Sequence, residues 1–299
     1  MLINIKQELE KAGCVVLLNE NMSRHTTLKT GGNANVFCKC PDISSAESAY
    51  KYLYRNNIPF FVTGASSNLL ISDKGYQGVI LKFFGDNYIV DFGGGNIEAS
   101  GGANCYNVIK YALSKGYIGG EFAATIPGSV GGHIVNNAGC YNREMKDIVL
   151  SCECLIEGKK YLLDGKECCF SYRKSFFSGK KCIILKARFK FIQGDKQVGL
   201  NELKRLQLLR RQTQPIEPSA GSIFLRKEGV IPAKLIDEAG LKGLKYGSAE
   251  VSKKHSGFIV NTGGACSQDV FLLIGKIKKI INKKYAILLE EEVLYIGEF

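Results

Sequence analysis

Residues 121–145 read EFAATIPGSVGGHIVNNAGCYNREM, and this stretch decides how the chain is interpreted. It has glycines at positions 128, 131, 132 and 139 and no charged side chain between Glu121 and Arg143. Glycine lets backbone N–H groups approach a ligand closely, and successive N–H groups in turns form concave anion sites. A second segment of this character, TGASSNLL, covers residues 63–70. The two segments predict a site that grips a phosphate-bearing cofactor from two sides.

The sequence lacks the two commonest phosphate-binding motifs. A Rossmann fold carries G-x-G-x-x-G between a strand and a helix, but Gly93-Gly94-Gly95 is followed by Asn96-Ile97-Glu98. No G-x-x-x-x-G-K-[ST] motif occurs either. A phosphate ligand would therefore be held by another scheme. A plain turn is the alternative reading of either glycine segment taken alone.

The two glycine segments resemble the FAD-binding segments of the UDP-N-acetylenolpyruvoylglucosamine reductases, flavoenzymes that complete UDP-N-acetylmuramate. The resemblance covers residues 21–297 and continues in the same order through further blocks: Ser171-Tyr172-Arg173, Ala220-Gly221-Ser222-Ile223-Phe224, Gly240-Leu241-Lys242-Gly243, Val251-Ser252-Lys253-Lys254-His255 and Leu289-Glu290-Glu291-Glu292-Val293. The chain is short after Gly243, which is similar to the form of the family that lacks an extra tyrosine-bearing loop.

The resemblance implies an α+β fold. The expected architecture is an FAD-binding domain of the vanillyl-alcohol-oxidase/PCMH type, made of two α+β subdomains, followed by an α+β substrate-binding domain. A polar break at residues 194–197 marks the expected boundary. The FAD-binding domain is thus expected at 1–195, with subdomains of about 1–75 and 76–195, and the substrate-binding domain at 196–299.

The activity implied by the resemblance is that of an oxidoreductase that reduces an enolpyruvyl ether to a lactyl ether. NADPH would give hydride to non-covalently bound FAD, and the flavin would pass it to C3 of the substrate, UDP-N-acetylglucosamine enolpyruvate. A proton would then reach C2. The cofactor supplies the hydride chemistry, while the protein supplies orientation, charge stabilisation and the proton. The product is a peptidoglycan precursor, which links the reaction to cell wall biogenesis, cell shape and cell division.

The resemblance assigns the FAD contacts to the two glycine segments. The first supplies Gly64, Ala65, Ser66, Ser67, Asn68 and Leu69, and the second supplies Thr125, Ile126, Pro127, Gly128, Gly131, Gly132 and Asn136. The family usually has glycine where this chain has Ala65 and Ser66. Both replacements are small, so a similar loop is expected.

Three residues are expected to act in the chemical step. Addition of hydride to C3 pushes charge onto the substrate carboxylate, and Arg173 is the candidate that forks onto it. Ser222 is the proposed proton donor, because a C2 carbanion is basic enough to accept a proton from a well-placed hydroxyl. Glu292 takes the position of the family's acidic residue. It would be protonated at that step, or would orient Arg173 or a water molecule.

Polar residues of the C-terminal part are the candidates for contacts to the UDP group. These are Arg210, Gln214, Arg226 and Lys234, and Tyr172 is a further candidate for stacking on the substrate or donating to its phosphates. After Phe224 the family often runs Lys-Asn/Arg-Pro, whereas this chain has Leu225-Arg226-Lys227. Only Arg226 is retained from that run. The three histidines, including His255, are interpreted as structural.

The net charge of +12 leaves three interpretations of the lysines open. They attract a small polyanion such as NADPH or a UDP-sugar, they bind nucleic acid, or they are solvated surface charges. No aromatic-interleaved basic strand or recognition helix supports nucleic-acid binding. An alcohol or aldehyde oxidase on the same FAD scaffold is the alternative enzyme.

Cysteine usage and the N-terminus bear on ligands and location. The eleven cysteines include Cys38/Cys40 and Cys152/Cys154, two C-x-C pairs in strand-like runs, but no C-x-x-C. These are interpreted as small apolar side chains, and no metal site is expected. The N-terminus lacks the apolar region of a signal peptide. A cytoplasmic monomer without a membrane or nucleic-acid partner is therefore expected.

Hydrophobic periodicity and capping residues predict the elements. Helices are expected at 44–56 with a capping box from Ser44 and Glu47, at 104–115 after Asn104, at 200–213 and at 232–239. A last helix is expected with Ser267 as its cap, and its apolar face is formed by Val270, Leu273, Ile274, Ile277 and Ile281. Strands are expected at 59–63, 78–83, 148–150, 154–156, 160–163, 182–185 and 293–296, and a further extended segment at 222–225.

Overall fold

The computed structural model describes residues 1–227 and 229–299 and divides into two compact units. The first unit contains residues 1–18, 36–65 and 78–209, and the second contains residues 19–35, 66–77 and 210–299. Each unit is thus assembled from three separate stretches of the chain. The domain division after residue 195 stays a prediction, and helix α6 (Lys196–Thr213) begins at that point.

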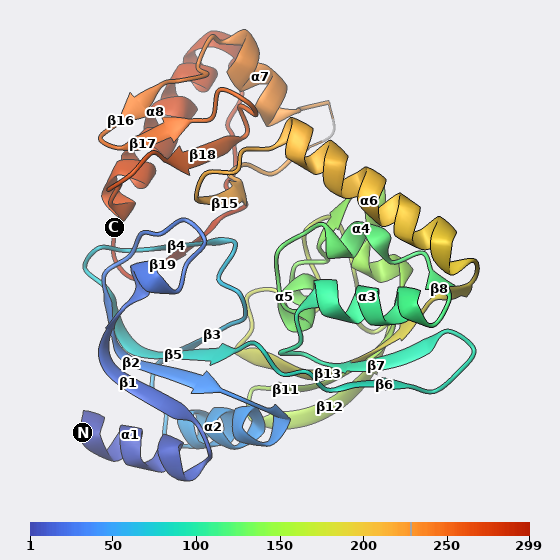
Figure 1. Cartoon of the computed structure of the whole chain (residues 1–299). Coiled ribbons are helices and arrows are strands. Elements are labelled where there is room, and N and C mark those ends of the chain that lie inside the picture. The colour runs from blue at the N-terminus through green and yellow to red at the C-terminus, as the bar shows by residue number, and fades with distance from the viewer. Residues whose placement is uncertain (228) are drawn as a thin grey trace. The chain divides into compact units, whose positions relative to one another are not determined.

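A four-stranded sheet and two helices form one part of the first unit. The sheet has the order β1-β2-β5-β3, with β1 (Val15–Asn21), β2 (Asn33–Cys40), β5 (Tyr76–Phe83) and β3 (Phe60–Thr63). Helices α1 (Leu2–Lys11) and α2 (Ile43–Arg55) lie along this sheet (Figure 1). Leu9 and Leu53 of the helices share a buried core with Val36 and Leu81 of the strands. The apolar faces of both helices therefore close over the sheet.

The start of α2 corrects one detail of the sequence interpretation. Asp42 is the N-cap residue, and its side chain accepts a hydrogen bond of 2.8 Å from the Ser45 backbone N–H. Ser45 completes the capping box by accepting from the Asp42 N–H at 3.2 Å. The predicted capping box from Ser44 and Glu47 is wrong. The helix begins one residue earlier because an aspartate, one of the strongest N-cap residues, precedes it.

A five-stranded sheet forms the other part of the first unit. Its order is β12-β11-β13-β7-β6, with β12 (Lys159–Asp164), β11 (Val149–Ile156), β13 (Cys182–Lys190), β7 (Asn96–Ser100) and β6 (Ile89–Asp91). The neighbouring strands of this sheet pair antiparallel. Strands predicted separately at 148–150 and 154–156 are one strand, β11.

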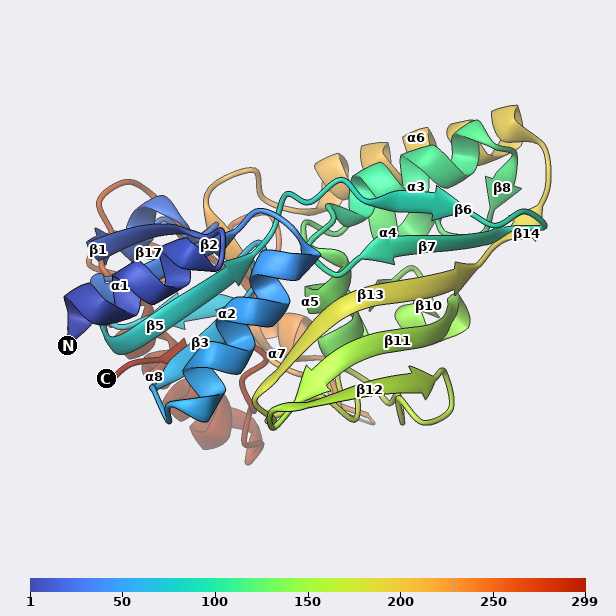
Figure 2. The same cartoon turned by 90° about the horizontal axis from the view of Figure 1, so that it is seen from below.

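The first half of β13, in the middle of this sheet, is buried on both faces. Helices α3 (Cys105–Ser114), α4 (Glu121–Ala124) and α5 (Val130–Val135) lie on one side of it (Figure 2). Because side chains alternate along a strand, Ile184 of β13 packs with these helices, whereas Ile183 and Leu185 join the core of α2. The near-continuous apolar run of β13 is explained by this double burial.

Two helices of the first unit test the capping predictions. Asn104 caps α3 as predicted, and its side chain accepts from the Tyr106 N–H at 3.0 Å. Helix α6 was expected to begin at residue 200 but begins at Lys196, because Asp195 accepts from the N–H groups of Gln197 and Val198. Two short pairs complete this unit: β8 (Tyr117–Ile118) with β14 (Ile192–Gln193), and β9 (Gly139–Cys140) with β10 (Arg143–Glu144).

The second unit contains its own sheet and helices. Its four-stranded sheet has the order β15-β18-β17-β16, with β15 (Ser219–Ser222), β18 (Phe258–Asn261), β17 (Ala249–Val251) and β16 (Lys245–Tyr246). The other elements are α7 (Pro232–Glu238), α8 (Ser267–Tyr285) and the parallel pair β4 (Leu69–Ile71) and β19 (Leu294–Ile296).

Helix α8 supplies much of the core of the second unit. The residues predicted from its apolar periodicity, Val270, Leu273, Ile274, Ile277 and Ile281, are all buried. The helix begins at Ser267 itself, so the N-cap is Cys266 rather than the predicted Ser267. Helix α7 begins with Pro232 as predicted. The strand expected at 222–225 ends at Ser222, because residues after it leave the sheet.

Within residues 1–227 and 229–299, no helix combines the length and the apolar character that crossing a membrane requires.

Candidate functional site

In the first unit, the two glycine segments touch each other at Gly64 and Ser129. A Cβ atom at Gly64 would lie 2.0 Å from the Ser129 Oγ and 2.9 Å from its Cβ. No side chain can be accommodated at that distance. The tip of β3 is thus pressed against the residue that caps α5, whose Oγ accepts from the Gly132 N–H at 3.1 Å. The structure therefore joins the start of the first predicted segment to the middle of the second.

Packing explains why the second segment is so rich in glycine. A Cβ at Gly128 would lie 2.4 Å from the His133 ring, and one at Gly131 would lie 3.1 Å from the Gly101 carbonyl oxygen. The Gly131 N–H donates to that same Gly101 oxygen at 2.8 Å, and the Gly128 oxygen accepts from the Cys105 N–H at 3.1 Å. The segment is therefore fixed closely against the turn that precedes α3.

The other predicted FAD residues of this unit lie in and beside the same segment. Thr125 is buried, and its hydroxyl donates to the Phe122 oxygen at 2.7 Å, while Ile126 is half-buried and Pro127 exposed. The Asn136 amide donates to the Gly132 oxygen at 3.1 Å. Between Phe122 and Asn142 the segment offers N–H and O–H donors and no charged side chain. This donor set fits the pyrophosphate of FAD, because an anion there meets no carboxylate.

The first segment passes from the first unit to the second between Ala65 and Ser66. Ser66 is buried and adopts a φ of 55°, a conformation that favours glycine. Its carbonyl oxygen accepts from the Thr27 N–H at 3.5 Å. The usual glycine of the family at this position is explained by the positive φ, which this chain adopts with a serine.

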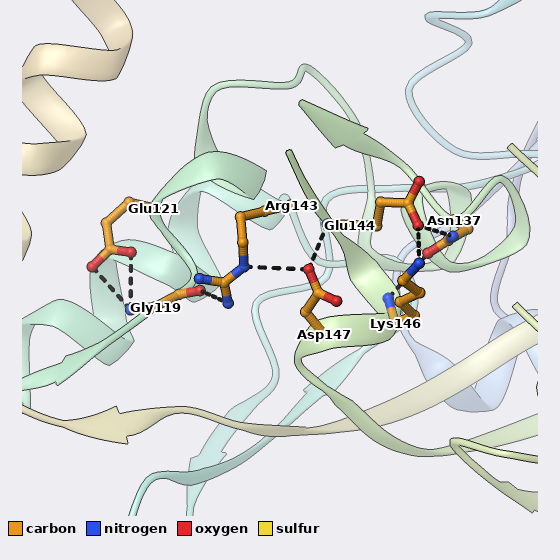
Figure 3. Close-up of polar contacts among 7 residues, drawn as sticks. All are labelled: Gly119, Glu121, Asn137, Arg143, Glu144, Lys146 and Asp147. Carbon is orange, nitrogen blue, oxygen red and sulfur yellow. Dashed lines mark hydrogen bonds and ion pairs between the residues drawn. The ribbon is translucent and has the colours of Figure 1, made fainter. Parts of the chain in front are cut away.

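A buried asparagine next to the glycine segment was not predicted. Asn137 has no exposed surface, and its amide donates to the Ser171 oxygen at 2.9 Å and to Glu144 Oε2 at 3.0 Å. Its Oδ1 accepts from the Lys146 N–H at 3.0 Å, and Lys146 forms an ion pair with Glu144 (Figure 3). Asn137 thereby connects the glycine segment to the Ser171-Tyr172-Arg173 turn.

Figure 3 also shows how the ends of this segment are held. Glu121 accepts from the Gly119 N–H through both carboxylate oxygens, at 3.0 and 2.9 Å. The Arg143 guanidinium donates to the Gly119 oxygen at 3.1 Å and to Asp147 at 3.2 Å. Glu121 and Arg143, the charged residues at the two ends of the segment, therefore both bind Gly119, which holds the two ends close together.

Arg173 lies in a tight turn of the first unit. Ser171 and Lys174 exchange backbone hydrogen bonds of 2.9 and 3.1 Å across the turn, and Arg173 adopts a φ of 55°. Its Nη2 donates to the Gly139 oxygen at 2.8 Å, and its guanidinium carbon lies 5.0 Å from the centre of the Tyr172 ring. The Arg173 side chain is thus tied to Gly139 at the end of the glycine segment, while its main chain lies within the turn that Ser171 and Lys174 close.

In the second unit, the predicted residues Asn68 and Glu292 lie beside each other. The Asn68 side-chain amide donates to the Glu292 backbone oxygen at 3.0 Å, and the Asn68 backbone oxygen accepts from the Leu294 N–H at 3.0 Å. Leu69 then pairs with Leu294 at the start of the parallel strands β4 and β19. The end of the first glycine segment is therefore fastened to the backbone on both sides of Val293.

The Ser222 segment lies against the same acidic segment. The Glu292 N–H donates to the Ile223 oxygen at 2.7 Å, and the Leu225 N–H donates to the Glu290 oxygen at 2.9 Å. Ser222 pairs with Phe258 in the sheet, and the Ile223 N–H donates to the Gly257 oxygen at 2.9 Å. The structure therefore brings together three separate predicted motifs of the second unit: those of Asn68, Ser222 and Glu292.

Glu290 and Glu291 each form a salt bridge with a lysine. Glu290 pairs with Lys227 at 2.5 Å, and Glu291 pairs with Lys278 at 2.7 Å. Glu291 also accepts a hydrogen bond of 3.4 Å from the Tyr295 hydroxyl. Burial, and to a lesser extent the negative charge of Glu291, raises the pKa of Tyr295. Structural partners thus account for Glu290 and Glu291.

The residues predicted to contact the UDP group lie at several separate places. Lys234 lines an open groove of about 590 Å³ together with Ala233, Asp237, Glu238, Lys242, Lys254, His255 and Ser256. Lys234 lies 3.7 Å from Glu238, and Lys242 lies 2.6 Å from Asp237. Arg226 is exposed, and Gln214 follows the last turn of α6, its N–H bonded to the Arg210 oxygen at 2.8 Å. The groove is lined by both signs of charge.

The sequence analysis missed Asn137 and the basic residues Lys242 and Lys254 of the groove. Asn137 follows Asn136 directly, and paired asparagines in a glycine-rich loop are a signal, since asparagine tolerates a positive φ. Asn137 adopts a φ of 41°. Lys242 and Lys254 both lie in recognised blocks, but only the folded chain shows that they share one groove.

Comparisons with known proteins first define the class. The FAD binding domain family matches residues 34–159. The solved structure of a berberine bridge enzyme variant shares the fold, with a TM-score of 0.50 at 9% identity over 65% of this chain and 44% of that one. The fold is the predicted α+β flavoprotein fold, and the chain is an FAD-dependent oxidoreductase.

The same comparisons define the family. The C-terminal domain family of UDP-N-acetylenolpyruvoylglucosamine reductase matches residues 213–296. A reductase of that name from Caldanaerobacter subterraneus is 41% identical over 100% of this chain and 99% of its own length, and one from Clostridium botulinum (strain Hall) is 38% identical over 95% and 93%. The crystal structure of the Thermus caldophilus enzyme gives a TM-score of 0.80 at 29% identity, covering 95% of this chain and 99% of that one. The chain belongs to the UDP-N-acetylenolpyruvoylglucosamine reductase family.

Proposed function

We propose that this chain reduces UDP-N-acetylglucosamine enolpyruvate to UDP-N-acetylmuramate with NADPH, in the synthesis of peptidoglycan precursors. One observation carries the proposal beyond the family relationship. The Glu292 N–H donates to the Ile223 oxygen at 2.7 Å, which holds the candidate acid Ser222 and the candidate carboxylate Glu292 on adjacent segments. A proton donor and a carboxyl group held close together suit a reaction in which a carbon next to the substrate carboxylate takes up a proton.

FAD is held, in this proposal, by the two glycine segments. Residues 64–69 and 125–136 supply backbone N–H groups and small hydroxyl side chains to its pyrophosphate. Bound FAD would supply the hydride chemistry, with NADPH as the hydride donor and C3 of the vinyl group as the acceptor. The contact of Gly64 with Ser129 supports this assignment, because it joins one end of the first segment to the second.

Ser222 donates the proton to C2 of the substrate. Hydride addition leaves C2 with carbanion character, and the Ser222 hydroxyl transfers its proton to that carbon. Pairing with Phe258 and the Ile223 bond to Gly257 fix the backbone from which this hydroxyl extends. A positioned acid of this kind contributes about 10² to 10⁴ in rate.

Arg173 stabilises the negative charge that develops on the substrate carboxylate. A guanidinium binds a carboxylate with two parallel N–H donors, and such bonds strengthen as charge accumulates. One of its N–H groups is already used on the Gly139 oxygen, which fixes the orientation of the remaining donors. Glu292 assists at the same carboxylate. As a protonated carboxyl it donates a hydrogen bond, and as an ionised one it orients a water molecule.

Contacts to the UDP group are proposed for Tyr172, Arg210, Gln214, Arg226 and Lys234. The three lysines of the groove, Lys234, Lys242 and Lys254, support phosphate binding there, because their ammonium groups can donate to phosphate oxygens. The chain is further proposed to act as a cytoplasmic monomer without a nucleic-acid or membrane partner. Size-exclusion chromatography with light scattering tests the oligomeric state, and a dimer mass would refute that part alone.

An absorbance scan of the purified chain, followed by anaerobic titration, tests the function. We expect a flavin spectrum that NADPH bleaches and that UDP-N-acetylglucosamine enolpyruvate restores. Folded protein that takes up no flavin would refute the cofactor assignment. Reduced flavin that is reoxidised by O₂ but not by the enolpyruvyl substrate would instead favour an alcohol or aldehyde oxidase.

A further inference from the structure

Three thiol groups meet in the core of the first unit. Cys38 and Cys40 lie two residues apart on β2, so their side chains point to the same face of the sheet. Cys14 lies between the end of α1 and the start of β1. The three sulfur atoms lie within 4.8 Å of one another, and the Cys14 and Cys40 sulfurs are 3.7 Å apart.

The cluster is enclosed by apolar side chains. Cys38 and Cys40 have no exposed surface and Cys14 is 6% exposed. All three belong to the core between the four-stranded sheet and helices α1 and α2, together with Leu9, Val16 and others. Another buried pair, Cys152 and Cys168, has sulfurs 3.9 Å apart but is not joined by a third thiol at comparable range among the described residues. The cluster at Cys14 therefore differs from ordinary buried cysteines in its number of converging sulfurs.

The three sulfurs lie close enough together to bind one ion at the same time. The Cys14 thiol also lies 3.8 Å from the Ser45 backbone oxygen, to which it donates a hydrogen bond. Thiol ligands lose their protons when a metal ion binds, so an ion among the sulfurs would replace these S–H contacts.

We propose that Cys14, Cys38 and Cys40 form a three-sulfur binding site for monovalent copper, a site separate from the flavin chemistry. Thiolates select soft ions such as Cu(I) and zinc. Structural zinc takes four ligands at about 2.3 Å for sulfur, whereas the cluster offers three sulfurs and, among residues 1–227 and 229–299, no histidine or carboxylate joins them.

Competition with a coloured chelator tests the site. The full flavin-loaded chain, reduced with a phosphine under nitrogen, is titrated against the Cu(I) complex of bicinchoninate, whose colour disappears as the protein removes the metal. We expect the chain to withdraw one equivalent of copper. Changes in the groups around a metal site already cost about 10- to 100-fold in affinity. Loss of a ligand in Cys38→Ala should therefore weaken binding by at least that factor.

Matched variants exclude the other thiols. Cys152→Ala removes one member of the buried two-thiol pair, and Cys169→Ala with Cys266→Ala removes two exposed cysteines. These variants should bind copper like the unmodified chain. Equal binding by Cys38→Ala and the unmodified chain would overturn the proposal, as would loss of binding in the Cys169→Ala/Cys266→Ala variant. Flavin content and circular dichroism establish that each variant is folded.

X-ray absorption at the copper edge decides the case without any substitution. Copper in the unmodified chain should have three sulfur neighbours. Two sulfur neighbours, or nitrogen and oxygen neighbours, would contradict a three-sulfur site. Preferential uptake of zinc over Cu(I) in a competition with both ions would also refute the assignment of the metal.

Discussion

The turn that carries Arg173 and the strand that carries Ser222 are held in two different ways. Side chains hold the first: the Asn137 amide binds the Ser171 oxygen, and the Arg173 guanidinium binds the Gly139 oxygen. Backbone hydrogen bonds hold the second: Ile223 binds Gly257 through its N–H and Glu292 through its oxygen. A geometry held by main-chain bonds survives side-chain substitution, whereas one held by side chains does not. Variants at Ser222 therefore report chemistry, while variants around Arg173 also report positioning.

Replacement of the proposed acid should have the largest effect. In Ser222→Ala the strand keeps its backbone bonds, so flavin binding and reduction by NADPH should be unchanged. Reoxidation by the enolpyruvyl substrate should slow by about 10² to 10⁴ because the positioned proton donor is lost. Stopped-flow absorbance of the two half-reactions measures each rate separately.

Ser219→Ala is the matched control for this experiment. Ser219 lies on the same strand, and its backbone oxygen, which accepts from the Thr27 hydroxyl at 2.8 Å, is retained in the variant. Both half-reactions should proceed normally in Ser219→Ala. Normal reoxidation in Ser222→Ala would remove Ser222 from the mechanism.

Arg173→Lys should have the next largest effect. Lysine keeps the positive charge but cannot fork onto a carboxylate. Loss of one donor that acts on developing charge costs on the order of 10² to 10³ in rate, and the retained charge should keep the loss near the lower limit. The decrease should appear in substrate-dependent reoxidation. A variant with nearly normal turnover would show that Arg173 does not stabilise the reacting carboxylate.

Asn137→Gly tests whether the turn depends on a buried side chain. Glycine accepts the φ of 41° but removes the bonds to Ser171, Glu144 and the Lys146 N–H. Leaving buried polar groups without partners costs about 1 to 3 kcal/mol, so the free energy of unfolding should fall by that amount. Reoxidation should slow less than in Arg173→Lys, since the guanidinium is still present. Denaturant unfolding and stopped-flow kinetics measure the two effects.

Asn142→Gly separates the effect of glycine from the loss of the amide. Asn142 is exposed and has a φ of 60°, so the same substitution there changes backbone freedom alone. Its stability and kinetics should remain close to those of the unmodified chain. Equal changes in the two variants would contradict a positioning role for Asn137.

Local signals explain how much of the fold the sequence predicted. Asn104 and Pro232 mark helix starts because their effects act within one turn, and the buried stripe of α8 follows from a regular period. The errors are of a different kind. Asp42 and Ser44 both suit the N-cap of α2, and a local pattern does not show which of them takes that position. The assembly of each unit from three separate stretches depends on tertiary contacts, which no local pattern contains.

The residues of the candidate site were likewise predictable from the sequence, whereas the contacts between them were not. Ser222 and Glu292 were identified from blocks of sequence, and the structure adds that their segments are hydrogen-bonded. The family resemblance assigned Asn136 to the cofactor and gave Asn137 no role. Only the fold shows that Asn137 reaches Ser171 whereas Asn136 bonds within its own turn. Likewise, C-x-C spacing predicted that Cys38 and Cys40 share a face, but not that Cys14 joins them.

The smallest expected effect concerns pH and the groove of the second unit. Burial lowers the pKa of His255 below its ordinary value of 6.5, and the positive charges of Arg226 and Lys242 lower it further. The neutral ring also accepts a hydrogen bond from the Gly257 N–H at Nδ1, 3.1 Å away, which protonation would remove. The folded chain therefore binds fewer protons than the unfolded chain just below pH 6.5, and this contribution to stability is lost as the pH falls from 6.5 through the lower pKa of the folded chain.

His255→Asn isolates this contribution, because the Asn Oδ1 can take the place of Nδ1 but does not titrate. Asp237, Glu238 and Lys254 also line the groove, so both proteins share their titration, and only the difference between the two is informative. Between pH 7.5 and about 5.5, the free energy of unfolding of the unmodified chain should fall more steeply than that of His255→Asn. Denaturant unfolding at a series of pH values measures both slopes. Parallel slopes would mean that His255 titrates alike in the folded and unfolded chains, which would refute its role as a buried neutral acceptor next to Gly257.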